Sequence, residues 1–149
     1  MNELHGYYIE DLEPGMQASM ARTVTEADIV MFAGVTGDTN PVHLNEEYAN
    51  ATIFKGRIAH GMLSAGLISA VLGTKLPGPG CVYLEQNMRF TAPVKIGDTV
   101  TATATVKEVN TEKKRVVLET ICRVGDQVVV DGQARLSVMS RQKQQQAAE

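Results

Sequence analysis

The chain has 149 residues, of which 44% are hydrophobic and 21% are charged, and its formal net charge at pH 7 is -3. These values fit one compact domain with its own hydrophobic core and exclude an intrinsically disordered chain. The acidic balance, without a stripe of Lys and Arg, argues against a nucleic-acid-binding protein.

Neither end of the chain nor its interior carries a membrane signal. The N-terminal residues 1–15 are too polar and acidic for a signal peptide. The longest apolar run, residues 61–73, is too short and too rich in Gly and Ser to cross a bilayer. We therefore expect a cytoplasmic protein with no membrane partner.

The first predicted elements flank the turn at residues 13–15, with a short strand or an extended arm on each side. A helix follows over residues 25–36. Thr25 can cap this helix, and Asp28 lies three residues further on, as in a capping box. Gly37 is well placed to end the helix.

Residues 37–43, GDTNPVH, are predicted to be irregular and not helical. Pro41 disfavours the helical conformation at Asn40, the residue before it. A short second helix then begins at Asn45, which is a favourable capping residue, and runs to about residue 50.

A third helix is predicted over residues 59–74, AHGMLSAGLISAVLGT, with its start near His60 and Gly61. Its residues are apolar or small on every face, which is typical of a helix that is buried all round. Gly73 and the run LPGPG that soon follows end it.

From residue 81 onwards, hydrophobic residues alternate with a period of two. Turn residues near 93–98, 110–112 and 125–126 divide this part into four strands, which we expect to form an antiparallel meander. The whole chain is thus of the α+β class, with five or six strands around one central helix. Since a single sheet cannot surround that helix, an interface is expected, most simply in a C2 dimer.

Asp38 and His43 are candidates for acid–base chemistry, because the breaks around them fix the loop that carries them. The unpaired N–H groups near His60 and Gly61, where the central helix begins, suit a carbonyl oxygen that gains negative charge. Two alternatives stay open at this point. Turn formation alone explains Asp38 well, and Asp38, His43 and His60 form a two-His, one-carboxylate set for a metal.

Three segments resemble one family closely. These are FAGVTGDTNPVHLNEEYA (residues 32–49), IAHGML (58–63) and YLEQNMRFTAPVKIGD (83–98). They resemble the (R)-specific enoyl-CoA hydratases, also called the hydratase-2 or MaoC-like dehydratase family. The resemblance implies a hot-dog fold, which we expect to span residues 1–139. The last ten residues, 140–149, are polar and low in complexity, so we expect them to form a tail. The resemblance also implies a homodimer or a dimer of dimers.

The family's activity is the reversible addition of water to trans-2-enoyl-CoA, giving (R)-3-hydroxyacyl-CoA. By resemblance, Asp38 and His43 are the catalytic pair, Asn40 orients their loop, and the Gly61 N–H is the oxyanion donor. Some members carry a serine on the central helix that supports the aspartate; we align that position with Gly66, so this contact is expected to be missing here.

The resemblance implies no cofactor and no metal, because hydration of an activated double bond involves no redox change and coenzyme A is part of the substrate. The CoA phosphates need cations, and the candidates are Lys55, Arg57, Arg89 and Lys95. Small residues on the central helix favour short acyl chains. The alternatives are a 3-hydroxyacyl-carrier-protein dehydratase, a non-catalytic subunit that binds acyl thioesters, and, less favoured, a thioesterase.

Overall fold

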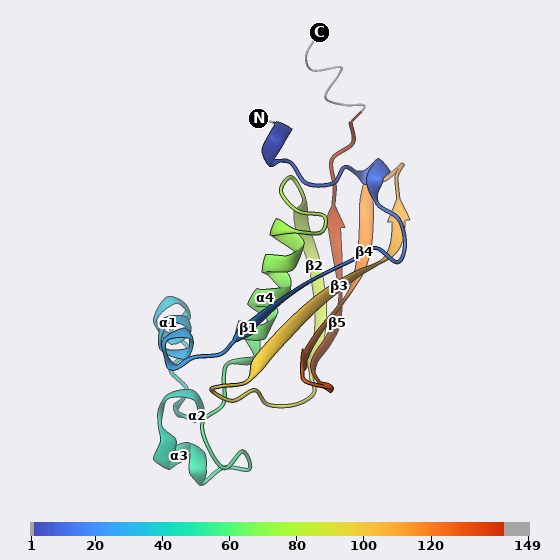
Figure 1. Cartoon of the computed structure of the whole chain (residues 1–149). Helices are drawn as coiled ribbons and strands as arrows, with labels where there is room; N and C mark the ends of the chain where they lie inside the picture. The colour runs from blue at the N-terminus through green and yellow to red at the C-terminus, as the bar shows by residue number, and fades with distance from the viewer. Residues whose placement is uncertain (1, 142–149) are drawn as a thin grey trace.

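A computed structural model describes residues 2–141 as one helix packed against a five-stranded antiparallel sheet, with shorter helices beside them (Figure 1). This arrangement confirms the predicted α+β class. In chain order the elements are the 3-10 helices η1 (Asn2–Leu4) and η2 (Ile9–Asp11), β1 (Gln17–Thr23), α1 (Glu26–Thr36), α2 (Pro41–Leu44), α3 (Glu46–Asn50), α4 (Gly61–Thr74), β2 (Val82–Phe90), β3 (Thr99–Asn110), β4 (Arg115–Val124) and β5 (Gln127–Ser137).

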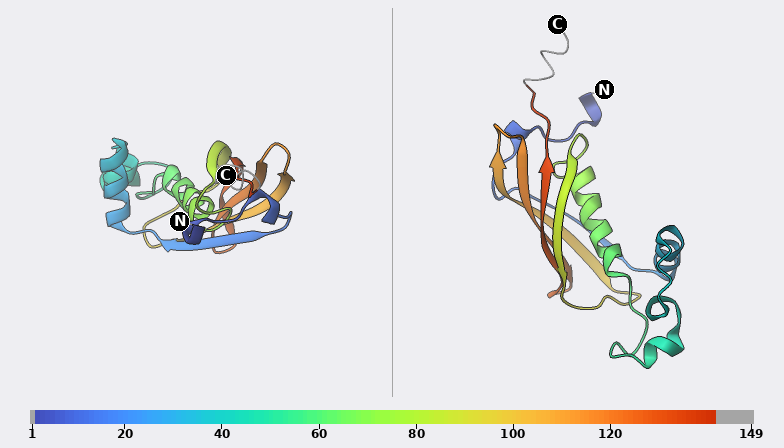
Figure 2. Two further views of the ribbon diagram at one scale, coloured as in Figure 1. Left: turned by 90° about the horizontal axis from the view of Figure 1, so that it is seen from above. Right: turned by 180° about the vertical axis from the view of Figure 1, so that it is seen from behind.

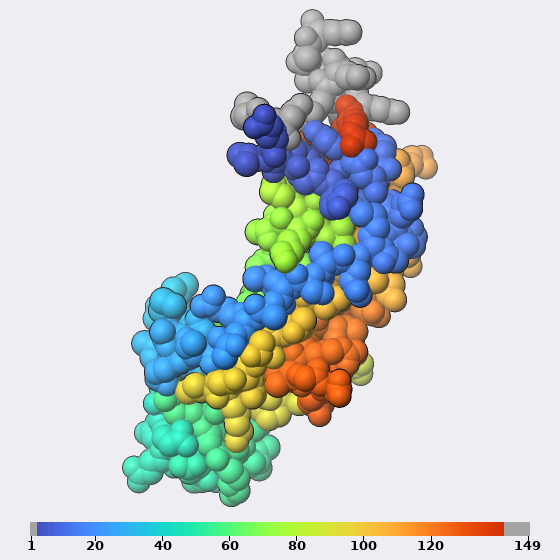
Figure 3. All heavy atoms as spheres, in the orientation of Figure 1, coloured from blue at the N-terminus to red at the C-terminus, as the bar shows by residue number. Residues whose placement is uncertain are grey.

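The sheet curves around one side of α4, and α1, α2 and α3 gather beyond the end at which α4 begins (Figures 1 and 2). In the space-filling view these three short helices form a lobe at one end of an elongated molecule (Figure 3). Among residues 2–141, no helix is both long enough and apolar enough to cross a bilayer.

Helix α1 begins and ends as the sequence predicts. Thr25 Oγ1 accepts a hydrogen bond from Asp28 N at 3.2 Å, and Asp28 Oδ2 accepts one from Thr25 N at 2.9 Å, which completes the capping box. Gly37 ends the helix with a φ of 76°, in the left-handed region that glycine enters easily.

The prediction that residues 37–43 contain no helix is wrong for their second half. Pro41, Val42 and His43 belong to α2, a single helical turn. Proline is well tolerated at the first helical position, and the Asn40 side chain caps the turn by accepting a hydrogen bond from Val42 N at 3.1 Å. The break at Asn40 therefore starts a helix instead of a loop.

The chain before the turn at residues 13–15 also differs from the predicted strand or extended arm. It forms η2, a 3-10 turn in which Asp11 Oδ2 accepts a hydrogen bond from Tyr8 N at 3.0 Å. The strand predicted after the turn is confirmed as β1.

The predicted meander is correct for β3, β4 and β5 but wrong for β2. The strand order is β1-β3-β4-β5-β2, so β2 pairs with β5 and lies at an edge of the sheet. The eight-residue link over 91–98, which contains Pro93 and Gly97, is too long for a tight hairpin and carries the chain across to β3. This crossover lets the link form one wall of the cavity described below.

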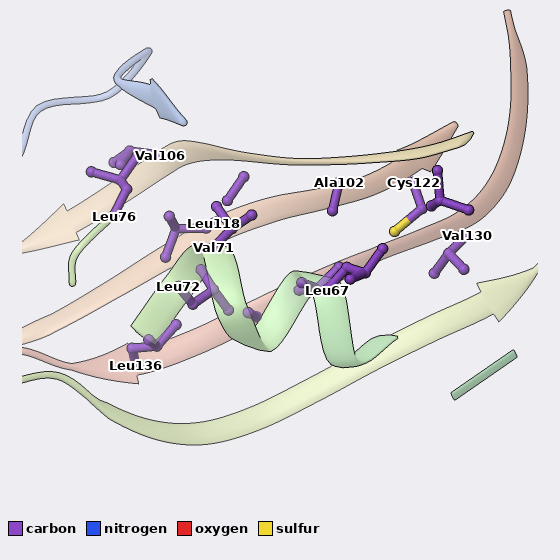
Figure 4. Close-up of a cluster of buried hydrophobic side chains, with 14 of the residues drawn as sticks. Leu67, Val71, Leu72, Leu76, Ala102, Val106, Leu118, Cys122, Val130 and Leu136 are labelled. Carbon is purple, nitrogen blue, oxygen red and sulfur yellow. The ribbon is translucent and has the colours of Figure 1, made fainter. Parts of the chain in front are cut away.

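The hydrophobic core lies between α4 and the sheet. Figure 4 shows Leu67, Val71 and Leu72 of α4 packed toward the strands. Their partners in the cluster include Leu118 of β4 and Leu136 of β5, each with no exposed surface. The prediction that α4 is buried on every side is wrong for a single copy of the chain, because Met62 on this helix is 55% exposed.

The predicted domain boundary at residue 139 falls next to two residues that contact the domain. The Ser140 hydroxyl hydrogen-bonds to the Glu10 carboxylate, and the Arg141 guanidinium makes two hydrogen bonds of 2.7 Å to Asp11. The rest of the predicted tail, residues 142–149, lies outside the described residues, so that part stays a prediction.

Candidate active site

Asp38 is the first residue after the left-handed turn that ends α1. Its backbone N–H donates to Thr36 Oγ1 at 3.1 Å, and its carboxylate accepts a hydrogen bond from Asn40 N at 3.3 Å. The residue is exposed. The carboxylate is therefore held by local hydrogen bonds at the surface of the site, where water can reach it.

His43 lies on α2 and is only 8% exposed. Its Nδ1 is 2.8 Å from the carbonyl oxygen of Ile58. Because a carbonyl oxygen only accepts hydrogen bonds, Nδ1 must carry the proton, and in the neutral ring Nε2 is left with a free lone pair. The hydrogen bond to Ile58 therefore fixes the neutral tautomer of His43 as one that can accept a proton at Nε2.

Asn40 lies between Asp38 and His43 and makes hydrogen bonds on both sides. Its side-chain oxygen caps α2, the helix that carries His43, while its backbone N–H donates to Asp38. One residue thus connects the carboxylate to the helix that carries the imidazole.

His60 has a larger part in this site than the sequence indicates. It is 2% exposed, and its Nε2 donates to the Asp38 carbonyl oxygen at 2.9 Å. Its ring lies 3.8 Å from the ring of His43 and 4.6 Å from that of Phe32, measured between centroids. In the sequence, His60 is only the residue before Gly61. Its position in the chain does not show that it connects α1, α2 and α4.

The donor atoms of Asp38, His43 and His60 all lie within 4.8 Å of one another. The sequence-based alternative of a two-His, one-carboxylate metal set therefore has its three residues together. In each imidazole one nitrogen is already bonded to a backbone carbonyl, through His43 Nδ1 and His60 Nε2. The same cluster, without a metal, presents a carboxylate and an unprotonated imidazole nitrogen that can share one water molecule.

The N-terminus of α4 forms the other half of the site. Gly61 lines the same cavity as His43, a space of about 400 Å³. A Cβ atom at this position would come within 2.6 Å of the Phe90 ring, so any other residue here would force that ring to move. The Gly61 N–H belongs to the first turn of the helix and makes no hydrogen bond within the described part of the chain. It can therefore stabilise an oxygen that gains negative charge.

The four predicted CoA-binding cations divide into two pairs. Arg57 is already used, because its guanidinium makes bonds of 2.8 and 2.9 Å to Glu26 and its Nε donates to the His43 carbonyl at 2.6 Å. Arg89 pairs with Asp131 at 2.9 Å and lies next in the strand to Phe90, which lines the cavity, so the two side chains point to opposite faces of the sheet.

The two lysines remain near the cavity. Lys95 Nζ donates to the carbonyl of Phe54, a residue that lines the cavity, at 3.1 Å. Lys55 follows Phe54 directly, is exposed, and makes no ion pair within residues 2–141.

The serine positions on α4 differ in environment. Gly66, which we align with the serine of some family members, is exposed, and a Cβ there would meet nothing within 4 Å. Ser69 is exposed, whereas Ser64 is buried and lines the cavity.

Cys122 is buried and does not offer a nucleophile, because burial raises the pKa of its thiol to about 12.

Comparison with known proteins decides the family. A family model described as the MaoC like domain matches residues 11–135. The chain belongs to the MaoC-like family. The MaoC-like chain is also similar to a solved structure, the R-hydratase PhaJ1 from Pseudomonas aeruginosa in its unliganded form. The TM-score is 0.84, with 45% identity, over 90% of this chain and 86% of that one. This similarity confirms the predicted hot-dog fold.

Two relatives of this MaoC-like chain carry informative names. A Rhodospirillum rubrum protein named (R)-specific enoyl-CoA hydratase is 57% identical, over 91% of this chain and 94% of its own length. A Methylorubrum extorquens protein named 3-hydroxybutyryl-CoA dehydratase is 49% identical, over 95% of this chain and 90% of its own length. The first name describes the addition of water to an enoyl-CoA, and the second describes the removal of water from 3-hydroxybutyryl-CoA.

Proposed function

We propose that this MaoC-like protein hydrates short-chain trans-2-enoyl-CoA reversibly to (R)-3-hydroxyacyl-CoA. The observation that supports the proposal most is the fixed tautomer of His43, a residue that clusters with Asp38 and lines the same cavity as Gly61. The names of the two relatives support the same reaction.

The proposed reaction uses each group once. The Asp38 carboxylate and His43 Nε2 hold one water molecule, and one of these two groups accepts a proton from that water as the water oxygen forms a bond to C3 of the enoyl group. The electron pair of the double bond moves toward the thioester oxygen, which accepts a hydrogen bond from Gly61 N–H. A proton then returns to C2, so the net change is the addition of one water molecule.

The proposed reaction uses neither a cofactor nor a metal. A protein that uses only its own acid and base groups keeps its activity after treatment with a chelator. We expect the hydration rate after dialysis against EDTA to stay within about twofold of the untreated rate. If the rate falls tenfold and Zn²⁺ or Fe²⁺ restores it, the alternative of a metal held by Asp38, His43 and His60 is correct instead.

Coenzyme A is the proposed carrier of the acyl group, with its phosphates held by Lys55 and Lys95 near the cavity. Arg57 acts on the protein itself through Glu26 and the His43 carbonyl. The double variant Lys55→Ala/Lys95→Ala is expected to raise KM for crotonyl-CoA several-fold with little change in kcat, because these cations contact a remote part of the substrate. Arg89→Ala is the matched control and should leave KM unchanged.

The functional unit is proposed to be a homodimer, or a dimer of such dimers. The edge strand β2 carries exposed apolar side chains, Val82 at 56%, Leu84 at 48% and Phe90 at 53%. The other edge strand, β1, instead presents polar residues such as Gln17 and Ser19. A second copy of β2 would pair the free backbone groups of this edge and cover its apolar residues.

The loss of the ultraviolet absorbance of crotonyl-CoA tests the proposed activity directly. An (R)-specific 3-hydroxyacyl-CoA dehydrogenase added afterwards should oxidise the product, and an (S)-specific one should not. The same acyl group on an acyl carrier protein is expected to turn over more slowly. Faster turnover on carrier protein would favour the dehydratase alternative. No turnover of either substrate would favour a non-catalytic subunit, and release of a free thiol would indicate a thioesterase.

A further inference from the structure

The side chain of Arg57 contacts two helices of the site, although the proposed reaction gives it no step. Its guanidinium makes hydrogen bonds of 2.8 and 2.9 Å to the carboxylate of Glu26, the first residue of α1. Its Nε donates to the backbone carbonyl of His43 at 2.6 Å. The Arg57 side chain is only 14% exposed. A nearly buried cation therefore connects the start of α1 to the residue of α2 that carries the proposed acid–base group.

Helix α2 depends on such contacts for its orientation. It has only four residues, and a single helical turn is not stable without tertiary packing. His43 lies in its last turn, where backbone carbonyls have no partner within the helix. Arg57 supplies that partner, and a hydrogen bond from a charged donor is stronger than one from a neutral donor. Arg57 thus holds the backbone of His43.

The next residue in the chain holds the imidazole of His43. The Ile58 carbonyl oxygen is 2.8 Å from His43 Nδ1, and Ile58 N donates to the Val42 carbonyl at 3.3 Å. Two consecutive residues, Arg57 and Ile58, therefore fix both the backbone and the ring of His43. Because they are consecutive, a displacement of Arg57 also displaces the carbonyl that sets the tautomer of His43.

Glu26 keeps the Arg57 side chain where it reaches His43. A carboxylate bound by two N–H groups fixes the plane of the guanidinium as well as its distance. The hydrogen bonds from Arg57 lower the pKa of Glu26, so the pair stays charged at neutral pH. Since Glu26 is 56% exposed, the pair adds little to the free energy of unfolding. Its main effect is therefore on the geometry of the site.

We propose that Arg57, held by Glu26, is a positioning residue for His43. This inference rests on the proposed hydratase function. The two residues keep α2 in place beside α1, so that the His43 imidazole keeps its distance from the Asp38 carboxylate. A displacement of about 1 Å in such a site can cost about 10²-fold in rate. Arg57 thus acts on the rate of hydration and not on the binding of coenzyme A.

Two thioester substrates separate this role from phosphate binding. Crotonyl-CoA carries the CoA phosphates, whereas crotonyl-N-acetylcysteamine ends before them. Arg57→Ala should lower kcat/KM about tenfold or more for both, and for crotonyl-CoA the loss should be in kcat with little change in KM. Lys55→Ala/Lys95→Ala should instead affect crotonyl-CoA alone, through KM. A loss in Arg57→Ala that is confined to crotonyl-CoA would assign Arg57 to CoA binding and overturn the inference.

Further variants separate the geometry of Arg57 from its charge. Arg57→Lys keeps the charge but cannot make all three hydrogen bonds, so it should lose nearly as much kcat as Arg57→Ala. Glu26→Gln should lower kcat about threefold, with no further loss when it is combined with Arg57→Ala. Arg141→Ala breaks a similar two-bond pair, with Asp11 on η2, and is the matched control that should keep full activity. Full activity of Arg57→Lys would overturn the inference.

The tautomer of His43 gives a measurement that needs no turnover. Nitrogen NMR of labelled histidine distinguishes an imidazole protonated at Nδ1 from one protonated at Nε2. The wild type and Arg141→Ala should show His43 protonated at Nδ1, and Arg57→Ala should show a mixture, because Ile58 is less firmly held. If Arg57→Ala changes neither the tautomer nor kcat, the inference is wrong while wild-type hydration stands. If the tautomer changes but the wild type does not hydrate crotonyl-CoA, the proposed function is wrong, while the hold of Arg57 on His43 stands.

Discussion

His60 touches three parts that the reaction needs. Its Nε2 donates to the Asp38 carbonyl, its ring stacks on His43, and the next residue is Gly61, the proposed oxyanion donor. Because these contacts are to other residues of the site, we infer that His60 is a positioning residue, which aligns Asp38 and His43 with the start of α4.

Two substitutions of His60 separate its hydrogen bond from its ring. Gln can place an N–H near the position of Nε2 and should keep kcat for crotonyl-CoA within about tenfold of the wild type. Phe keeps the stacking on His43 and Phe32 but has no donor, and should lower kcat about 10²-fold with little change in KM, because misplaced groups lose rate. Steady-state kinetics and thermal unfolding of both variants check this. If both variants fold and have equal kcat values, the hydrogen bond from His60 to the Asp38 carbonyl does not position the site.

Asp38, His43, Asn40 and Gly61 could be nominated from the sequence because they lie in segments that resemble a family motif, and their catalytic roles stay predictions. The sequence did not identify the role of His60 or the burial of Ser64. Both depend on which side of α4 meets the sheet and the short helices, which a uniformly apolar helix does not reveal. Arg57 was predicted to bind CoA, and its ion pair with Glu26 depends on a tertiary contact between residues 31 positions apart.

At the scale of elements, the start of α1 is linked to β1 through an ion pair. Arg22 of β1 donates to Asp28 at 2.6 Å, and the Asp28 side chain also accepts the Thr25 N–H. The Arg22 hydrogen bond, helped by the Thr25 N–H, lowers the pKa of Asp28 from 3.8 to about 2. The carboxylate thus stabilises the folded protein when it is charged, and it holds the helix that leads to Asp38.

The pH dependence of stability follows from this shift. A carboxyl group with a lowered pKa in the folded state stabilises fully above its unfolded pKa, and the effect is lost as the pH falls from about 4 to about 2. Asp28→Ala should lower the free energy of unfolding by about 1–2 kcal/mol at pH 7. Chemical denaturation of wild type and variant should show this difference shrinking at pH 3. Asp126→Ala, in an exposed turn, is the control; an equal loss there would contradict the assignment.

Most elements could be predicted because their local signals agree with the fold. The capping box of α1 and the alternation in β3, β4 and β5 are examples. Two of the errors show a tertiary and a local cause. β2 carries the same alternation as its neighbours, and its pairing with β5 is set by the crossover at residues 91–98. Pro41 breaks a helix when it is inside one, but at the first position it begins α2.

If the molecule is a dimer through β2, a substitution on that strand should halve its mass in solution. Leu84→Lys places a charge on the exposed apolar edge of β2 and should convert the protein from a dimer to a monomer at micromolar concentration. Val35→Lys also replaces an exposed apolar residue, on α1, and should leave the dimer intact. Light scattering coupled to size-exclusion chromatography gives both masses. A wild-type monomer, or dissociation by Val35→Lys alone, would show that β2 is not the interface.

In the proposed reaction, Asp38 and His43 together activate water for hydration of an enoyl thioester. The most direct measurement is the rate of loss of crotonyl-CoA absorbance for the wild type, Asp38→Asn and His43→Gln. Each variant should fold normally and lose about 10²-fold or more in kcat, because each removes one acid–base group. Near-full activity in both folded variants would contradict the claim and place the chemistry elsewhere in the molecule.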